Sequence, residues 1–189
     1  MPTSAIEGKN WTLQTLLRLS EQLEFKQILD VGPGRGTYSL LLRHYWPQSH
    51  WTAVEIWEPY QARFGLDQIY DQVLIRDIRS YADTAPGYDL VFLGDVLEHM
   101  QQTEALAVVE SLLRHSKLLL ISIPIVDMPQ GESEGNPYER HVKADWSHPE
   151  IMACWGRYLA LGYLEEPIGV YILSAQSGLV EVIRLLCGT

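Results

Sequence analysis

The sequence of 189 residues predicts an α/β fold: a doubly wound, mostly parallel sheet of seven strands with an antiparallel C-terminal strand and helices on both faces. Short apolar runs alternate with segments of helical periodicity, which is typical of parallel sheets built from strand–helix–strand units. The first run, residues 27–31, ends in alternating glycines that open a helix-like segment, as expected of a buried strand and its turn. The last two runs are joined around residues 176–178, and so short a connection requires an antiparallel pair.

The elements are placed by periodicity and by turn residues. The expected strands are residues 27–31, 51–56, 72–75, 88–93, 117–123, 168–173 and 179–185. The expected helices are residues 4–24, 37–46, 58–66, 102–115 and 149–161. Pro47 ends the second helix, and Pro59 suits the first turn of the third. Pro86 and Gly87 precede the best strand candidate, which should be central in the sheet.

Length and a hydrophobic content of 47% fit one domain with a sizeable core. We expect residues 1–24 to form a helical extension packed on a single domain of residues 25–189. Residues 125–145 form an irregular insertion rich in Gly, Pro and Glu. Such segments in compact domains are usually lids, binding loops or disordered, and this one should hang over the site because it follows the fifth strand.

Charge and cysteine content limit the function classes. A net charge of −10 and a pI of about 5.0 argue against binding to bulk nucleic acid or to an anionic membrane surface. Cys154 and Cys187 form no Cys-x-x-Cys pair, so we expect neither a disulfide framework nor a zinc site, and a reducing cytoplasm fits best. Residues 1–10 lack the layout of a secretory signal, and no apolar run approaches the roughly 18 residues of a spanning helix. The sequence does not fix the oligomeric state.

The rest of the chain is arranged around the glycine turn. Its pattern, Asp30-x-Gly32-x-Gly34-x-Gly36, differs from the Gly-x-Gly-x-x-Gly of dinucleotide-binding turns. It resembles the first motif of class I S-adenosylmethionine-dependent methyltransferases. The resemblance implies that these residues and Pro33 hold the methionine end of the cofactor, where a carboxylate suits the α-ammonium group. The alternative is that the glycines only allow tight packing of strand and helix.

Two acids follow at the ends of the next strands. Glu55 lies about 20 residues past the glycines, where doubly wound folds place an acid that accepts hydrogen bonds from ribose hydroxyls. Ile56, the next residue, is also predicted to contact the cofactor. The family resemblance gives Asp77 the adenine amino group and places Ile78 near the ring, although Asp77 could instead be a helix N-cap.

The fourth strand leads into residues 94–100, Gly-Asp-Val-Leu-Glu-His-Met. This segment closely resembles the Asp-Val-Leu-Glu-His segment that follows the fourth strand in many small class I methyltransferases. Ligands of open α/β sheets bind outside the carboxyl ends of the strands near the topological switch point, so it would lie beside the glycine turn. Gly94 and Asp95 are therefore expected to form the wall between methyl donor and acceptor.

The candidate catalytic groups are two histidines. Methyl transfer from a sulfonium depends mainly on positioning, and a general base matters only if the acceptor must lose a proton. His99 is the first candidate for that base and His141 the second. The alternative for His99 is that it is only a surface residue, and the alternative for His141 is that it belongs to an ordinary solvated loop. The candidate acceptor-binding residues are Tyr138, His141 and Trp146, although aromatic residues more often fill the core.

The insertion and its neighbours also carry acids and histidines that could bind a metal ion. They are Glu132, Glu134, Glu139, His141, Asp145 and His148. Their spacing matches no established zinc or calcium pattern, so no metal site is expected there.

The sequence therefore predicts an S-adenosylmethionine-dependent methyltransferase that acts on an oxygen or nitrogen nucleophile of a small molecule or protein. One alternative is aminopropyl transfer from a decarboxylated cofactor, with Asp95 contributing to an amine-binding pocket. Another is a non-catalytic partner protein that keeps the fold and binds S-adenosylmethionine without turnover. A nicotinamide dehydrogenase is the weakest alternative, because Gly34 and Gly36 lie too close together for its phosphate turn.

Overall fold

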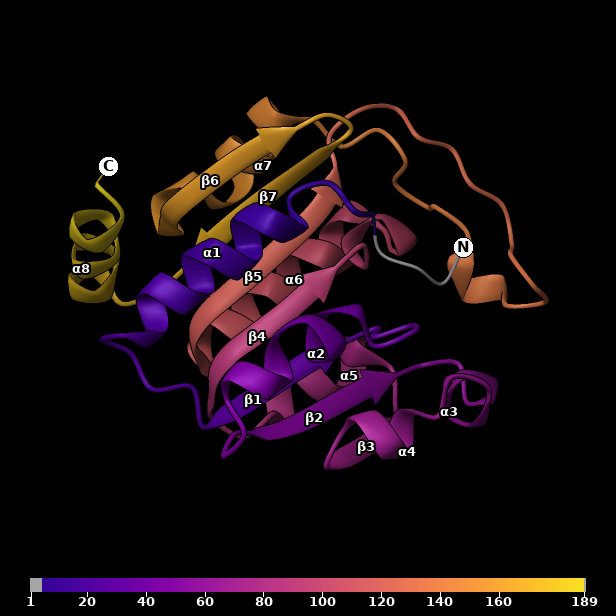
Figure 1. Ribbon diagram of the computed structural model, residues 1–189. Helices are drawn as coiled ribbons and strands as arrows, with labels where there is room; N and C mark the ends of the chain where they lie inside the picture. Colours follow the sequence, from indigo (N-terminus) through magenta and orange to yellow (C-terminus); the bar gives the residue numbers. More distant parts are fainter. Residues whose placement is uncertain (1–4, 189) are drawn as a thin grey trace.

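The computed structural model describes residues 5–188 and contains a seven-stranded sheet with the strand order β3-β2-β1-β4-β5-β7-β6 (Figure 1). The strands are β1 (Gln27–Val31), β2 (His50–Glu55), β3 (Gln72–Ile75), β4 (Tyr88–Gly94), β5 (Ser116–Pro124), β6 (Leu159–Glu165) and β7 (Ile168–Leu173). β1 pairs in parallel with β2 and β4, β2 with β3, and β4 with β5, whereas β7 is antiparallel to both β5 and β6. The predicted fold class is confirmed.

Helices cover both faces of this sheet. The α-helices are α1 (Lys9–Ser20), α2 (Thr37–Leu42), α3 (Pro59–Phe64), α4 (Leu66–Ile69), α5 (Ile78–Tyr81), α6 (Gln102–Arg114), α7 (His148–Trp155) and α8 (Ser177–Cys187). The short 3₁₀ helices are η1 (Arg43–Tyr45), η2 (Ala82–Thr84), η3 (Leu97–His99), η4 (Pro137–Glu139) and η5 (Gly156–Tyr158). Side chains of α5, α6 and α7 form one core with the sheet, and those of α1, α2 and α8 form the other.

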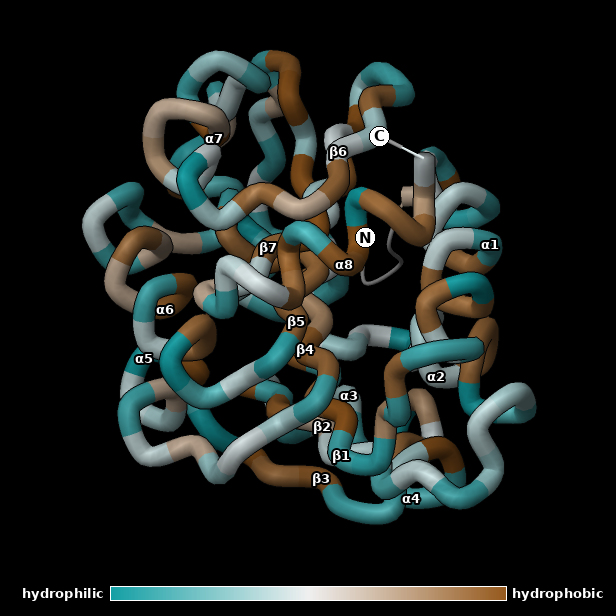
Figure 2. The backbone as a smooth tube through the Cα atoms, turned by 90° about the vertical axis from the view of Figure 1, so that its left-hand side faces the viewer, coloured by the Kyte–Doolittle hydropathy of each residue, from teal (hydrophilic) through white to brown (hydrophobic). Residues whose placement is uncertain are grey.

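The central strands are apolar along almost their whole length because both of their faces are covered. In β5 every residue except Lys117 is buried, and β7 is buried throughout. Figure 2 shows the same layering, with the strands between α1 and α2 on one side and α5 and α6 on the other. This explains why short, continuous apolar runs were sufficient to locate the parallel strands.

The order of the strands sets the position of the site. The chain runs outward from β1 to β2 and β3, and then returns to place β4 on the other side of β1. Val31 and Leu93 pair near the carboxyl ends of β1 and β4, so the segments that leave these strands diverge from neighbouring points. Such a topological switch point opens a crevice in which open α/β sheets bind their ligands.

The structure corrects two elements near the C-terminus. Residues 179–185, predicted as a strand, belong to helix α8, in which Leu179, Val180, Ile183 and Leu186 contact the core at helical spacing. The terminal hairpin is instead made by β6 and β7. The helix predicted over residues 149–161 ends at Trp155, and the chain enters the edge strand β6 at Leu159.

The N-terminal helix is shorter than the predicted residues 4–24. It begins after Gly8, which has a left-handed φ of 72°, and buries Leu16 and Leu19 in the core shared with α8. Residues 1–4, where the predicted extension starts, and Thr189 lie outside the described residues. Within residues 5–188, no helix combines the length and apolar character needed to cross a membrane.

The insertion of residues 125–145 is irregular, as predicted, and follows β5 across the carboxyl-end edge of the sheet (Figure 1). Its regular structure, within the described chain, is limited to η4 and a bridge between Ser133 and Asn136. The backbone N–H of His141 donates to the carbonyl of Gln130 at 3.0 Å, and that of Met128 donates to Ala144 at 2.9 Å. The insertion is therefore closed on itself by its own hydrogen bonds.

Candidate active site at the carboxyl ends of the parallel strands

A cleft of about 310 Å³ lies at the switch point, beneath the insertion. The ends of β1, β2 and β4, the segment after β3 and the insertion all contribute to its walls. All the residues predicted for the site line this cleft except Gly36 and Trp146. The fold thus brings together residues that are as far apart in the sequence as Asp30 and His141.

The glycine turn forms one wall of the cleft. Gly32 has a left-handed φ of 59°, and a Cβ atom there would come within 3.0 Å of the Val96 side chain. A side chain at this position would therefore strain the backbone and press on the segment after β4. Gly36 also has a left-handed φ, but it faces Ile69 and the Tyr70 hydroxyl, so the structure gives it a packing role.

Asp30 is a buried carboxylate at the end of β1, with 1% of its surface exposed. Its Oδ2 accepts a hydrogen bond of 2.6 Å from the hydroxyl of Tyr70. Burial raises the pKa of Asp30 to about 7, although the Tyr70 hydrogen bond and the nearby Lys9 ammonium act in the opposite direction. A cationic ligand group in the cleft would stabilise the ionised form of this carboxyl.

Glu55 is placed at the end of β2 and is also buried. Its Oε1 accepts a hydrogen bond of 2.8 Å from the backbone N–H of Trp57, which holds the carboxylate in one orientation. Burial raises the pKa of Glu55 to about 7, against the lowering effect of backbone hydrogen bonds from Trp57, Ile56 and Gly34. The carboxylate is thus tied to the backbone of the glycine turn on the neighbouring strand.

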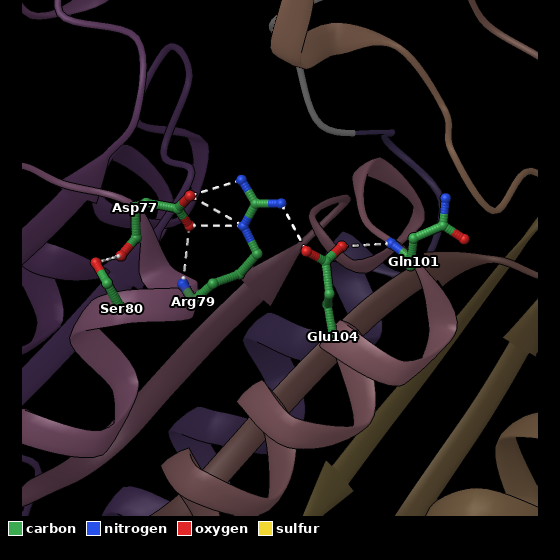
Figure 3. Close-up of polar contacts among 5 residues, drawn as sticks. All are labelled: Asp77, Arg79, Ser80, Gln101 and Glu104. Atoms are coloured by element: carbon green, nitrogen blue, oxygen red, sulfur yellow. Dashed lines mark hydrogen bonds and ion pairs between the residues drawn. The ribbon is translucent and has the colours of Figure 1, made fainter.

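Asp77 caps helix α5 and binds Arg79 (Figure 3). Its Oδ1 accepts from the Arg79 backbone N–H at 2.9 Å, and both carboxylate oxygens accept from the guanidinium at 2.6–3.0 Å. The same guanidinium donates to Glu104 at 2.9 Å, and Glu104 accepts from the backbone N–H of Gln101 at the start of α6. Partial burial raises the pKa of Asp77, but the hydrogen bonds from Arg79 lower it by a larger amount, so the net shift is downward. The N-cap alternative is realised, and the predicted contact with adenine stays a prediction.

The chain makes a strained turn after β4. A Cβ atom at Gly94 would lie 2.3 Å from Cε2 of Tyr38, so the position has no room for a larger residue. Asp95 has a φ of 55°, a left-handed conformation that is costly for a residue other than glycine. Its Oδ2 accepts a hydrogen bond of 2.9 Å from the backbone N–H of Ala5, which also lines the cleft. The start of the described chain therefore meets the site at Asp95.

The insertion is attached to both sides of the cleft. The backbone N–H groups of Val142 and Lys143 donate to the carbonyl of Glu98 at 2.8 and 3.0 Å. On the other side, Glu134 forms an ion pair with Arg63 of α3. These contacts place the insertion over the cleft and bring His141 next to η3.

His99, His141 and Glu98 form one group in the cleft. The Nδ1 atom of His99 lies 3.1 Å from the carbonyl oxygen of Arg140, and that of His141 lies 2.5 Å from the carbonyl oxygen of Met128. The ring centroids of the two histidines are 4.9 Å apart. Burial is the largest effect on His99 and lowers its pKa, which favours the neutral imidazole.

Glu98 is the residue of this group to which sequence reasoning gave no role. It is 1% exposed, and no other residue among those described donates a hydrogen bond to its carboxylate oxygens. Burial raises its pKa well above the usual range, and the nearby charge of Asp95 adds to the shift. Its position next to His99 was visible in the sequence, but the approach of His141 was not, because that depends on how the insertion folds.

Trp146 does not take its predicted place among the acceptor-binding residues. It is 1% exposed, and its ring lies 5.5 Å from that of Trp155 in the core beneath α7. The general tendency of aromatic residues to fill the core applies here. Tyr138, in contrast, is exposed at the mouth of the cleft, with its ring 6.0 Å from that of Trp57.

Comparisons with known proteins agree with this arrangement. No curated protein matches the sequence significantly. Among solved structures, the N-terminal domain of EvdMO1 with S-adenosylhomocysteine bound aligns at 14% identity over 90% of this chain and 81% of that chain, with a TM-score of 0.64. An S-adenosylmethionine-dependent methyltransferase from Clostridium acetobutylicum aligns at 11% identity over 89% and 92% of the two chains, with a TM-score of 0.65. The mitomycin 7-O-methyltransferase MmcR aligns at 16% identity over 87% and 54%, with a TM-score of 0.59.

At these identities the structural matches establish a shared fold. A family model described as a methyltransferase domain matches residues 9–165, which is most of the chain. The resemblance noted in the glycine turn and in the segment after β4 is thereby confirmed: the chain belongs to the methyltransferase domain family.

Proposed function

We propose that this protein transfers a methyl group from S-adenosylmethionine to an oxygen or nitrogen nucleophile of a small molecule or protein. The observation that carries the proposal is the pair of buried acids, Asp30 and Glu55, at the ends of adjacent strands in one cleft. The family match and the solved relatives, one of which carries S-adenosylhomocysteine, support the choice of cofactor.

The carboxylates of the cleft fit this cofactor. Asp30 is a buried carboxylate whose ionised form needs a cationic partner, and the α-ammonium group of the cofactor would supply one. Glu55 is held by the backbone and would accept hydrogen bonds from the ribose hydroxyls. Ile78 lines the cleft beyond Glu55, and Asp77 lies beside it, so the adenine would lie at the end of β3.

Bound S-adenosylmethionine would supply an electrophilic methyl carbon. The acceptor's lone pair would form the bond to this carbon, the electron pair of the broken carbon–sulfur bond would stay on sulfur, and the acceptor's proton would go to a base. The chain's own contribution is to align the acceptor with this carbon and to exclude water. The insertion covers the cleft between α3 and η3 and would serve both purposes. Among the residues there, His99 is neutral near pH 7 because burial lowers its pKa. As long as no ion occupies its Nε2 atom, it could accept a proton from a bound acceptor.

An oxygen acceptor is favoured over nitrogen by one comparison. The relative MmcR is named a 7-O-methyltransferase, and its fold matches this chain with a TM-score of 0.59.

The two cysteines, Cys154 and Cys187, are free thiols, which suits the reducing cytoplasm proposed from the sequence.

The proposal is tested by product analysis. The purified chain would be incubated with S-adenosylmethionine and pools of hydroxyl- or amine-bearing small molecules and peptides, and S-adenosylhomocysteine would be measured by mass spectrometry. We expect acceptor-dependent formation of S-adenosylhomocysteine, a loss of at least tenfold in Asp30→Ala, and no change in Glu110→Ala, an exposed acid of α6. Binding of the cofactor without turnover on any pool would support the non-catalytic alternative. Aminopropyl transfer from the decarboxylated cofactor would support the other.

A further inference from the structure

We propose that Glu98, His99 and His141 bind one first-row divalent metal ion on the acceptor side of the cleft. One possible ligand atom from each residue lies within 4.8 Å of the others. Zinc-type bonds to nitrogen and oxygen are about 2.1 Å long, so two ligands of one ion lie at most about 4.2 Å apart. Side-chain adjustments of less than about 1 Å would therefore bring all three atoms onto one ion.

The hydrogen bonds of the two histidines prepare them to be ligands. A carbonyl oxygen can only accept a hydrogen bond, so the Nδ1 atoms that contact the Arg140 and Met128 carbonyls must carry the hydrogen. Each neutral ring then presents the lone pair of Nε2. Metal-binding histidines are typically oriented in this way, with the other ring nitrogen donating to a carbonyl or carboxylate.

Glu98 supplies the second, independent observation. A carboxylate that is 1% exposed and receives no hydrogen bond from any other residue among residues 5–188 is costly unless a cation compensates it. Asp95 and Glu139 lie close enough to act on Glu98 electrostatically, and both make its ionised form less favourable. A divalent ion between Glu98 and the two imidazoles would reverse this balance.

The fold holds the three residues together without an ion. Glu98 and His99 are adjacent in η3, and the carbonyl of Glu98 accepts the two hydrogen bonds that dock Val142 and Lys143. His141 directly precedes that docked pair, so its position relative to η3 is fixed by the backbone. Such preorganisation limits the reorganisation that metal binding would require.

Two histidines and one carboxylate leave further coordination positions open. This donor set occurs at catalytic zinc sites, which keep a position for water or substrate, and at open non-haem iron sites. All three residues line the same cleft as Asp30 and Glu55, so the open positions would face the space over the cofactor. This role rests on the proposed function: a hydroxyl of the acceptor would bind the ion and lose its proton more readily, which narrows the acceptor to an oxygen nucleophile.

The test measures metal binding without methyl transfer. Tag-free protein would be stripped with EDTA and titrated with Co²⁺, followed by calorimetry and by the visible absorption of the ion, and S-adenosylhomocysteine would be titrated separately. We expect one equivalent of Co²⁺, with affinity reduced at least tenfold in Glu98→Gln and in His141→Ala. Glu110→Gln and His44→Ala, exposed residues of α6 and η1, are the matched controls and should bind like the wild type.

The outcomes separate the metal site from the proposed function. If the wild type does not bind Co²⁺, or if Glu98→Gln and His141→Ala bind it as tightly as the wild type, the metal site is overturned even if S-adenosylhomocysteine binds normally. Normal Co²⁺ binding without any affinity for S-adenosylhomocysteine would retain the metal site and overturn the cofactor. Because Glu98→Gln keeps the size of the side chain and His141→Ala lies in the insertion, retained S-adenosylhomocysteine binding in either variant shows an intact fold.

Discussion

At the scale of single residues, Asp30 links stability to function. Its pKa is 3.8 in the unfolded chain and is raised by burial to about 7 in the fold. The folded state therefore binds the proton more tightly. The resulting destabilisation is absent below pH 4, grows as the pH rises, and is complete above pH 7, where it reaches on the order of 4 kcal/mol.

Asp30→Asn should accordingly make the cofactor-free protein more stable at pH 8, by up to roughly 4 kcal/mol, and change it little at pH 4. Urea unfolding at both pH values measures this difference. Asp89→Asn is the control and should change the stability at pH 8 in the opposite direction. Burial raises the pKa of Asp89, but the Lys117 ion pair and two backbone hydrogen bonds lower it by a larger amount. A variant at Asp30 that is less stable than the wild type at pH 8 would contradict the account.

Glu55 makes a second prediction at this scale. Its pKa of about 7 means that the carboxyl is largely protonated at pH 6, when it is a poorer acceptor for ribose hydroxyls. Affinity for S-adenosylhomocysteine should therefore rise between pH 6 and pH 8. Glu55→Gln should weaken binding about 10-fold or more at pH 8 and give a shallower pH profile. Calorimetric titrations at three pH values would show this, and an unchanged profile in the variant would remove Glu55 from the site.

Residues of the site differ in how far the sequence could predict them. Asp30 and Glu55 could be predicted from the sequence because each stands at the end of its own strand, so the local pattern fixes its place in the fold. The group of Glu98, His99 and His141 could not be predicted from the sequence, because His141 comes close to Glu98 only through the docking of the insertion. Trp146 was misplaced since its burial depends on packing against α7.

At the scale of elements, the turn after β4 gives a sharp contrast between two glycines. A Cβ atom at Gly94 would clash with Tyr38, whose ring stacks on Phe92 at 4.5 Å, whereas nothing lies within 4 Å of a Cβ atom at Gly87. Gly94→Ala should lower the free energy of unfolding by about 1–3 kcal/mol, and Gly87→Ala by much less. Thermal unfolding of both variants tests this. Equal stability would mean that Tyr38 moves aside without cost.

The wrong prediction of a strand over residues 179–185 has a physical reason. Parallel strands are buried on both faces, so their continuous apolar runs identified them. α8 covers the core with one side only, and its short run of Leu, Val and Ile favoured a strand on composition. Its helical spacing, with Leu179, Ile183 and Leu186 toward the core, was the signal that should have decided.

At the scale of the whole molecule, the strand order determines where the candidate site lies. The reversal between β3 and β4 places the glycine turn, the acids of β1 and β2, and the segment after β4 around one cleft. The alternation of elements along the sequence was enough to predict this architecture. The internal hydrogen bonds of the insertion, residues 125–145, could not be predicted, since irregular backbone follows from tertiary contacts rather than from periodicity.

The central claim is that this cleft binds S-adenosylmethionine, and calorimetric titration of the purified chain with S-adenosylmethionine, S-adenosylhomocysteine and NAD tests it most directly. The account predicts micromolar affinity for both sulfur compounds and none for NAD, with weaker binding of both in Asp30→Ala. Tight binding of NAD, or full affinity for the sulfur compounds in Asp30→Ala and Glu55→Ala, would contradict it.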